Sequence, residues 1–198
     1  LWKGESDAQK YIPGLIEDLK AKGLAYESQG ALVVDIGQPG DSKELPPCIV
    51  QKSDGAALYA TSDLGTILER EKELHPDAYI YIADKRQELH FTQVFRVAKK
   101  AGFVAPDKPM SFLGFGTMNG KDGKPFKTRD GGVMRLEHLM DDINQAGYQR
   151  IMENRTATEE EARNTAKIVG LAALKYGDLS NQAAKDYIFD IDRFVSFE

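Results

Sequence analysis

Residues 120–132 combine four cationic side chains with four glycines. Glycine lets a backbone turn sharply and approach a ligand closely, and lysine and arginine pair with phosphate oxygens. No apolar periodicity in this stretch favours a helix or a strand. The segment therefore predicts a loop that binds a polyphosphate, although its composition taken alone favours an ordinary solvated loop.

Two further pairs of side chains could recognise a ligand. Tyr59 and Asp63 offer a flat apolar ring and a carboxylate, which together suit a guanidinium group. Gln87 and His90 are three residues apart, so they share one face of a helix. An amide can bind an amino or carboxylate group, and an imidazole can bind a phosphate or a ribose. Both pairs also fit a purely structural role, as polar side chains at helix starts.

A parallel sheet with helices packed on it would position these groups. Residues 78–83 and 110–115 are nearly continuous apolar runs, typical of strands buried on both faces. A helix is predicted between them by the apolar spacing of residues 91–98. Because ligands bind at the carboxyl ends of parallel strands, residues 84–87 and the loop after Phe115 are expected to share one crevice.

The segment before this sheet is predicted to contain a helix that starts near Pro13, a strand over residues 30–36 and a β-hairpin. The hairpin is predicted at Asp54-Gly55, between the apolar residues 48–51 and 56–59. Thr61 or Ser62 is expected to cap the following helix.

The carboxyl-terminal third is predicted to be helical. One helix is indicated by the spacing of Leu136, Leu139 and Ile143, and another by the capping box of Thr158 and Glu161. We therefore predict an α/β fold in three parts, over residues 1–55, 56–150 and 151–198, of which the last is helical.

The composition excludes several classes of function. The chain has 198 residues, a net charge of −5, 41% hydrophobic residues and one cysteine, Cys48. These values predict a globular protein from a reducing compartment, here taken as the cytoplasm, without membrane association. The three histidines are scattered without zinc-ligand spacing, so no protein-bound metal is expected. No phosphate-loop, dinucleotide-binding or nucleophile-elbow motif is present.

Three blocks of sequence, in order, resemble the arginyl-tRNA synthetase family. They are LYATSDLG at 58–65, YIADKRQELHFTQVF at 81–95 and FGTMNGKDGKPFKTR at 115–129, followed by further similar residues at 172–180 and 186–193. The resemblance implies a class I synthetase with a split, Rossmann-like nucleotide-binding fold. It makes residues 1–55 a connecting insertion, residues 56–150 the second half of that fold and residues 151–198 a helical extension. It also implies arginine, ATP (with Mg²⁺) and the arginine-accepting tRNA as partners, and a monomer.

The resemblance also assigns roles to individual residues. For arginine it implies Tyr59, Asp63 and Gln87, with Asp63 on the guanidinium. For ATP it implies His90, Gly114, Phe115, Gly116, Met118, Lys127, Thr128 and Arg129, with Lys127 and Arg129 as the catalytic cations. The loop departs from the lysine-rich form of other class I enzymes, so Lys121 or Lys124 is a candidate for the missing charge.

The resemblance is incomplete. The histidine–glycine signature that opens the family's fold is absent, as is the helical bundle that reads the anticodon. The chain begins without methionine and ends within an aromatic run, which predicts a piece of a longer protein. We expect the second half of a catalytic domain that is inactive alone. A non-catalytic arginine-binding module and a ligand-free scaffold remain alternatives.

Overall fold

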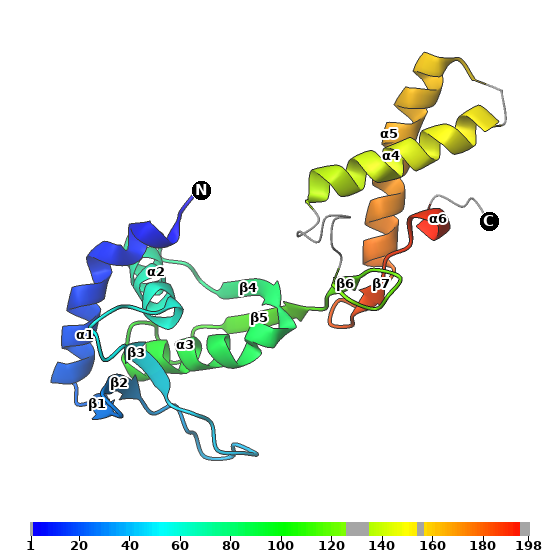
Figure 1. Cartoon of the computed structure of the whole chain (residues 1–198). Coiled ribbons are helices and arrows are strands. Elements are labelled where there is room, and N and C mark those ends of the chain that lie inside the picture. Colours follow the sequence, from blue (N-terminus) through cyan, green and yellow to red (C-terminus); the bar gives the residue numbers. More distant parts are fainter. Residues whose placement is uncertain (1, 126–134, 154–156, 195–198) are drawn as a thin grey trace. The chain divides into compact units, whose positions relative to one another are not determined.

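A computed structural model describes residues 2–125, 135–153 and 157–194 (Figure 1). The chain packs into two compact units, residues 1–113 and residues 114–198. This division reflects packing alone, so the predicted boundaries near residues 55 and 150 stay predictions about function.

The first unit mixes helices with two small sheets. Its elements are η1 (Glu5–Tyr11), α1 (Ile12–Ala21), β1 (Ala25–Ser28), β2 (Ala31–Val34), β3 (Cys48–Gln51), α2 (Tyr59–Glu73), β4 (Tyr79–Asp84), η2 (Lys85–Gln87), α3 (Glu88–Lys100) and β5 (Met110–Phe115). Strands β1, β2 and β3 form an antiparallel sheet in that order, and β4 pairs with β5. Strands β4 and β5 run in the same direction, with α3 as the connection between them (Figure 1).

The core of the first unit confirms the predicted helix faces. Many of its fully buried aliphatic side chains come from α1, β2, β3, α2 and α3, among them Leu15, Leu19, Val34, Val50, Leu64, Ile67, Val94 and Val97. Pro13 stands in the first turn of α1, and Gly23 follows its end with a φ of +64°, where glycine is favoured. The apolar spacing in the sequence therefore predicted α1 and α3 correctly.

The β-hairpin lies elsewhere than predicted. The antiparallel pair β1–β2 is joined by Gln29 and Gly30, whose φ angles of 51° and 81° are both positive, as a two-residue type I′ turn requires. Asp54 and Gly55 do lie in a turn, but residues 56–58 are not a strand and β3 pairs with β2 instead. The hairpin predicted at Asp54-Gly55 is therefore wrong.

Thr61 explains why the chain enters a helix at that point. Its hydroxyl donates to the carbonyl of Val50 at 2.7 Å and accepts from the backbone N–H of Leu58 at 3.1 Å. The bond to Val50 ties the first turn of α2 to β3, and the bond from Leu58 closes that turn. The helix begins at Tyr59 with Leu58 as its N-cap. Thr61 stabilises the helix from inside its first turn, so the predicted cap at Thr61 or Ser62 is also corrected.

The sheet of β4 and β5 is buried on one face only, contrary to the prediction. Tyr79 is 4% exposed, whereas Ile80 and Ile82 on the other face are 65% and 70% exposed, and Leu113 of β5 is 54% exposed. The buried face packs against α2 and α3, where the Tyr79 hydroxyl contacts the carbonyl of Ile67. Strands that are apolar on both faces are normally covered by helices on both faces. In this unit, helices cover only one face of the sheet.

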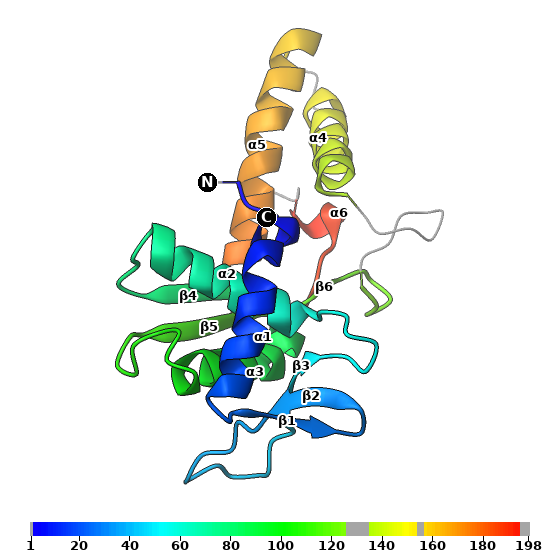
Figure 2. The same ribbon diagram turned by 90° about the vertical axis from the view of Figure 1, so that its left-hand side faces the viewer.

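The second unit is mainly helical. Its elements are β6 (Met118–Asn119), α4 (Leu136–Glu153), α5 (Glu159–Leu179), β7 (Tyr187–Ile188) and α6 (Ile191–Phe194). Helices α4 and α5 pack against each other: they cross in the view of Figure 1 and lie next to each other in Figure 2. Their core includes Leu139, Ile143, Leu174 and Phe189.

Both predicted helices of the second unit are confirmed. The apolar face of α4 is buried at Leu139 and Ile143. At the start of α5, Thr158 accepts from the backbone N–H of Glu161 at 3.3 Å, and the Glu161 carboxylate accepts from the backbone N–H of Thr158 at 3.0 Å. This reciprocal pair is the capping box predicted from the sequence.

A short parallel pairing holds the beginning and the end of the second unit together. Met118 and Asn119 of β6 pair with Tyr187 and Ile188 of β7. Just before β6, the backbone N–H of Gly116 donates to the carbonyl of Ala183 at 2.7 Å. Only glycine fits at residue 116, because a Cβ there would collide with the backbone of Lys185.

Candidate functional site

The first turns of α2 carry two of the predicted ligand-binding residues. Tyr59 opens the helix and Asp63 follows four residues later, so both side chains lie on one helix face. Tyr59 is 73% exposed, and Asp63 is half-buried. The sequence had indicated a strand-to-helix transition between them; the structure instead places both within one helix, which brings ring and carboxylate to the same surface.

Asp63 meets His90 of α3. The His90 Nε2 atom lies 2.6 Å from Asp63 Oδ2, across 27 residues of sequence. Both side chains are partly exposed, with 26% of His90 and 32% of Asp63 accessible. An ionised carboxylate only accepts hydrogen bonds, so Nε2 carries the proton of this bond. Two of the predicted site residues are therefore in direct contact.

Aromatic side chains of α3 and β4 pack next to the Asp63–His90 pair. The His90 ring packs edge-on against Phe91, with centroids 4.9 Å apart, and Phe91 packs against Tyr81 at the same centroid distance. The Tyr81 hydroxyl accepts a hydrogen bond from Arg70 at 3.1 Å. Burial raises the pKa of Tyr81; the Arg70 charge opposes this rise and the Asp63 charge adds to it. Tyr81 thus stays a neutral phenol beneath the site at neutral pH.

Gln87 lies at the junction of η2 and α3, three residues before His90. The turn is fixed by Asp84, whose carboxylate accepts from the backbone N–H of Arg86 at 2.9 Å and from its guanidinium at 2.6 Å and 2.8 Å. Hydrogen bonds from Arg86 hold the pKa of Asp84 at about 2, so this carboxylate is charged at all physiological pH values. Gln87 itself is exposed.

The other predicted site residues lie beyond the end of the first unit or outside the described residues. Gly114 and Phe115 are the last residues of β5, which crosses the boundary after Leu113, and Gly116 and Met118 follow in the second unit. Lys127, Thr128 and Arg129 lie outside the described residues. Met118 packs on the core of the second unit. The shared crevice of the two groups stays a prediction.

Lys121 has a structural partner in the second unit. Its ammonium group lies 2.9 Å from both Asp190 and Asp192, and these carboxylates raise its pKa. Of the two lysines proposed to add positive charge to the loop, Lys121 therefore stays protonated but is already paired with two carboxylates. Lys124 is exposed on the same turn, where its backbone N–H donates to Asp122 at 3.0 Å.

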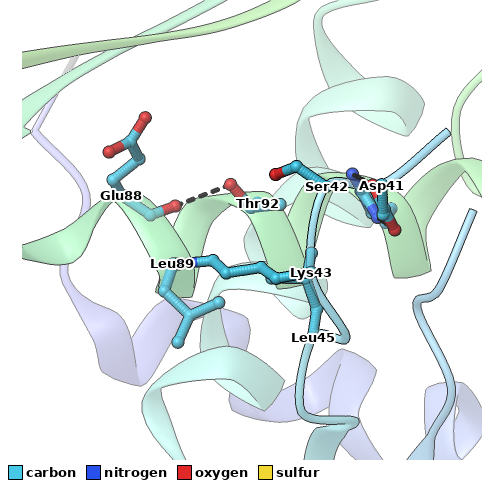
Figure 3. Close-up of a pocket in the computed structure, with 8 residues that line it drawn as sticks. Asp41, Ser42, Lys43, Leu45, Glu88, Leu89 and Thr92 are labelled. Atoms are coloured by element: carbon cyan, nitrogen blue, oxygen red, sulfur yellow. Dashed lines mark hydrogen bonds and ion pairs between the residues drawn. The ribbon is translucent and has the colours of Figure 1, made fainter.

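A pocket of about 300 Å³ lies between α3 and the loop before β3. Figure 3 shows loop residues Asp41, Ser42, Lys43 and Leu45 facing Glu88, Leu89 and Thr92 of the helix; Arg96 completes the lining. Arg96 donates to both oxygens of Asp41 at 2.7 Å and to the carbonyl of Ile36 at 2.9 Å. These residues were not among the predicted site residues, because no local pattern links positions 55 apart.

The Asp41–Arg96 ion pair gives a pH-dependent contribution to stability. Hydrogen bonds from Arg96 and from the backbone of Gln38 lower the pKa of Asp41 from 3.8 to about 2. Since the folded-state pKa lies below the unfolded value, the stabilisation is complete above about pH 4 and is lost as the pH falls toward 2. We expect the Asp41 carboxyl carbon to titrate near pH 2 by NMR, and nearer its ordinary pKa in Arg96→Gln. Identical midpoints in the two proteins would contradict this assignment.

Metal-ligating side chains do not gather within residues 2–125, 135–153 and 157–194. No three His, Cys, Asp or Glu side chains there form a cluster that could hold an ion. Cys48 is buried, and burial raises the pKa of its thiol to about 12. Over the same residues, no helix combines the length and the apolar character of a membrane span.

Comparison with known proteins places the chain among the synthetases. A family model described as the catalytic domain of class I tRNA synthetases (R) matches residues 1–191. Arginine–tRNA ligases from Agathobacter rectalis and Alkaliphilus oremlandii are 61% and 56% identical, over 204 and 198 aligned residues. Each alignment covers 100% of this chain and 34% of the relative. The chain thus spans about a third of the length of these curated relatives.

Solved structures share the fold at lower sequence identity. The arginyl-tRNA synthetase of Plasmodium falciparum matches with a TM-score of 0.78 and 21% identity, over 98% of this chain and 32% of that one. The Thermus thermophilus enzyme matches with a TM-score of 0.72 and 18% identity, over 98% and 37%. These likenesses support an α/β fold shared with both structures.

Proposed function

Because this chain belongs to the family of class I tRNA synthetase (R) catalytic domains, we propose that it is part of an arginine–tRNA ligase. The parent enzyme would activate arginine with ATP, release pyrophosphate and pass the arginyl group to tRNA. Since the chain spans 34% of its curated relatives, these activities are proposed for the whole protein. We further propose that the parent acts as a monomer in the cytoplasm.

The observation that carries the proposal is the exposed surface at the starts of α2 and α3. Tyr59 and Asp63 share one face of α2, and Asp63 contacts His90 at 2.6 Å. A carboxylate beside an exposed aromatic ring suits a guanidinium, which binds carboxylates through two parallel hydrogen bonds and stacks on aromatic faces. Tyr59, Asp63 and Gln87 are therefore the proposed arginine-binding residues.

The ATP side of the site is proposed from family membership. Gly114, Phe115, Gly116 and Met118 are the proposed contacts of the nucleotide; the resemblance also implies a place for His90 on the nucleotide side, next to Asp63. The remaining proposed contacts are Lys127, Thr128 and Arg129, which lie outside the described residues. There the two cations would stabilise the charge that develops on the leaving pyrophosphate, with Mg²⁺ carried on the phosphates of ATP. The reaction requires the arginine carboxylate to be aligned with the α-phosphate. It needs no covalent intermediate with the enzyme.

The exposed sheet face supports the view that this chain is half of a nucleotide-binding fold. Ile80, Ile82 and Leu113 leave apolar surface uncovered on β4 and β5, and exposed apolar patches commonly mark an interface. We propose that other parts of the parent protein cover this face and complete a Rossmann-like domain. The isolated chain is accordingly expected not to activate arginine.

The proposal is tested by amino-acid activation in the full-length parent protein. Arginine-dependent exchange of pyrophosphate into ATP is expected, measured with and without tRNA, together with arginylation of tRNA. Lysine at the same concentration is the matched control, because its point charge lacks the planar fork of a guanidinium. A parent protein that activates neither amino acid, with tRNA present, would leave a scaffold or binding role and refute the proposal.

A further inference from the structure

The hydrogen bond between His90 and Asp63 leaves the carboxylate able to bind a second partner. Two carboxylate oxygens offer about four lone-pair positions, and the bond from His90 Nε2 to Asp63 Oδ2 occupies one of them. The Asp63 side chain is 32% exposed, so ligand atoms can reach it. A guanidinium can therefore bind both oxygens while the histidine stays in place.

The His90 ring is itself held by its surroundings. Its neighbour Phe91 is 7% exposed and packs edge-to-face on the imidazole, at an interplanar angle of 78°. Phe91 in turn stacks on Phe112 of β5, with centroids 5.2 Å apart. The imidazole thus has little freedom to rotate, and its Nε2–H donor points from α3 to a carboxylate on α2.

We propose that His90 is a positioning residue of the arginine site, in which it orients the Asp63 carboxylate for the substrate guanidinium. A partly exposed aspartate without such a donor samples several rotamers, and ordering it would weaken substrate binding. His90 selects one orientation before the substrate arrives. This inference rests on the proposed arginine–tRNA ligase function, and it gives His90 a role distinct from a direct contact with ATP.

The experiment compares His90→Ala and His90→Gln in the full-length parent protein, with arginylation measured at saturating tRNA. A hydrogen bond to a charged group contributes enough that its loss should raise the KM for arginine about 10- to 100-fold. The KM for ATP should stay within about twofold of the parent value. The glutamine amide can donate from nearly the same place as Nε2, so His90→Gln should recover most of the arginine affinity. His138→Gln, on an exposed face of α4, is the matched control.

A double-mutant cycle distinguishes positioning from independent effects. If His90 acts through Asp63, His90→Ala should cost nothing further in an Asp63→Asn background. Additive effects, or a rise in the KM for ATP alone, would overturn the inference. If His90→Ala does not fold, His90→Leu keeps the bulk without the donor and takes its place in the cycle. A parent protein that shows no arginine-dependent activity before mutation would instead refute the proposed function itself.

Discussion

Replacing Asp63 by asparagine in the full-length parent protein is expected to lower kcat/KM for arginine by about 100- to 1000-fold. The amide keeps the shape of the carboxylate but removes the negative charge that a bidentate guanidinium requires. A bound arginine would displace water from the site. In such a site, the loss of one member of a charge pair weakens binding by about 3–4 kcal/mol. The loss should fall on the KM for arginine, and the KM for ATP should change little. Steady-state arginylation with each substrate varied in turn measures both constants.

The matched control for this substitution is Asp77→Asn, an exposed acid of the same unit. It removes the same charge from the protein surface without touching α2 or α3, so it accounts for any general electrostatic effect on tRNA binding. Citrulline, with a neutral urea group in place of the guanidinium, provides a second test: the preference for arginine over citrulline should shrink in Asp63→Asn. An unchanged arginine KM with undiminished discrimination would exclude Asp63 from guanidinium recognition.

Helices were the part of this fold most readily predicted from the sequence. In α3 the apolar residues repeat at helical spacing and Gly102 follows the end, with a φ of +70°. In α5 the capping box lies within four residues of sequence. Such signals are local, because the groups that interact are one helical turn apart. Local patterns therefore sufficed to predict α3 and the start of α5, whereas α5 ends at Leu179, two residues past Gly177, where its end was expected.

Strand partners depended on contacts that no local pattern contains. The Asp54-Gly55 pair is a good turn sequence, but the next residues enter a helix because Thr61 bonds to Val50 across the turn. The apolar run of β4 predicted cover on both faces, yet Ile80 and Ile82 on one face are exposed. Sequence alone shows that a surface is apolar and does not show which segment covers it.

The candidate site was predictable in part for the same reason. The residue types and the four-residue spacing of Tyr59 and Asp63 marked them as a pair, although the sequence had indicated a strand-to-helix transition between them and not one helix face. The contact between Asp63 and His90 joins two helices across 27 residues, and only the packing of α2 on α3 determines it. The sequence resemblance had assigned these two residues to different substrates, whereas the geometry makes them partners.

The second large effect is expected from Gly116→Ala, on the stability of the second unit. A methyl group at residue 116 would overlap the backbone carbonyl of Lys185 and the backbone nitrogen of Asp186, neither of which can swing aside as a side chain does. Overpacking against rigid neighbours costs about 3 kcal/mol. The segment is also tied to residue 116 through the backbone bond from Gly116 to Ala183 at 2.7 Å. The substitution must therefore break this pairing or distort it.

Hydrogen exchange in the full-length parent protein measures the effect where it arises. The amides of Tyr187 and Phe189 donate to the carbonyls of Thr117 and Asn119, so both should lose protection in the variant. Gly37→Ala is the control, since its new methyl group would meet no atom within 4 Å. If Gly116 is glycine chiefly because it borders adenine, the alanine variant should instead raise the KM for ATP and leave both amides protected. The protection of these two amides and the KM for ATP therefore show whether the fold or the nucleotide requires glycine at residue 116.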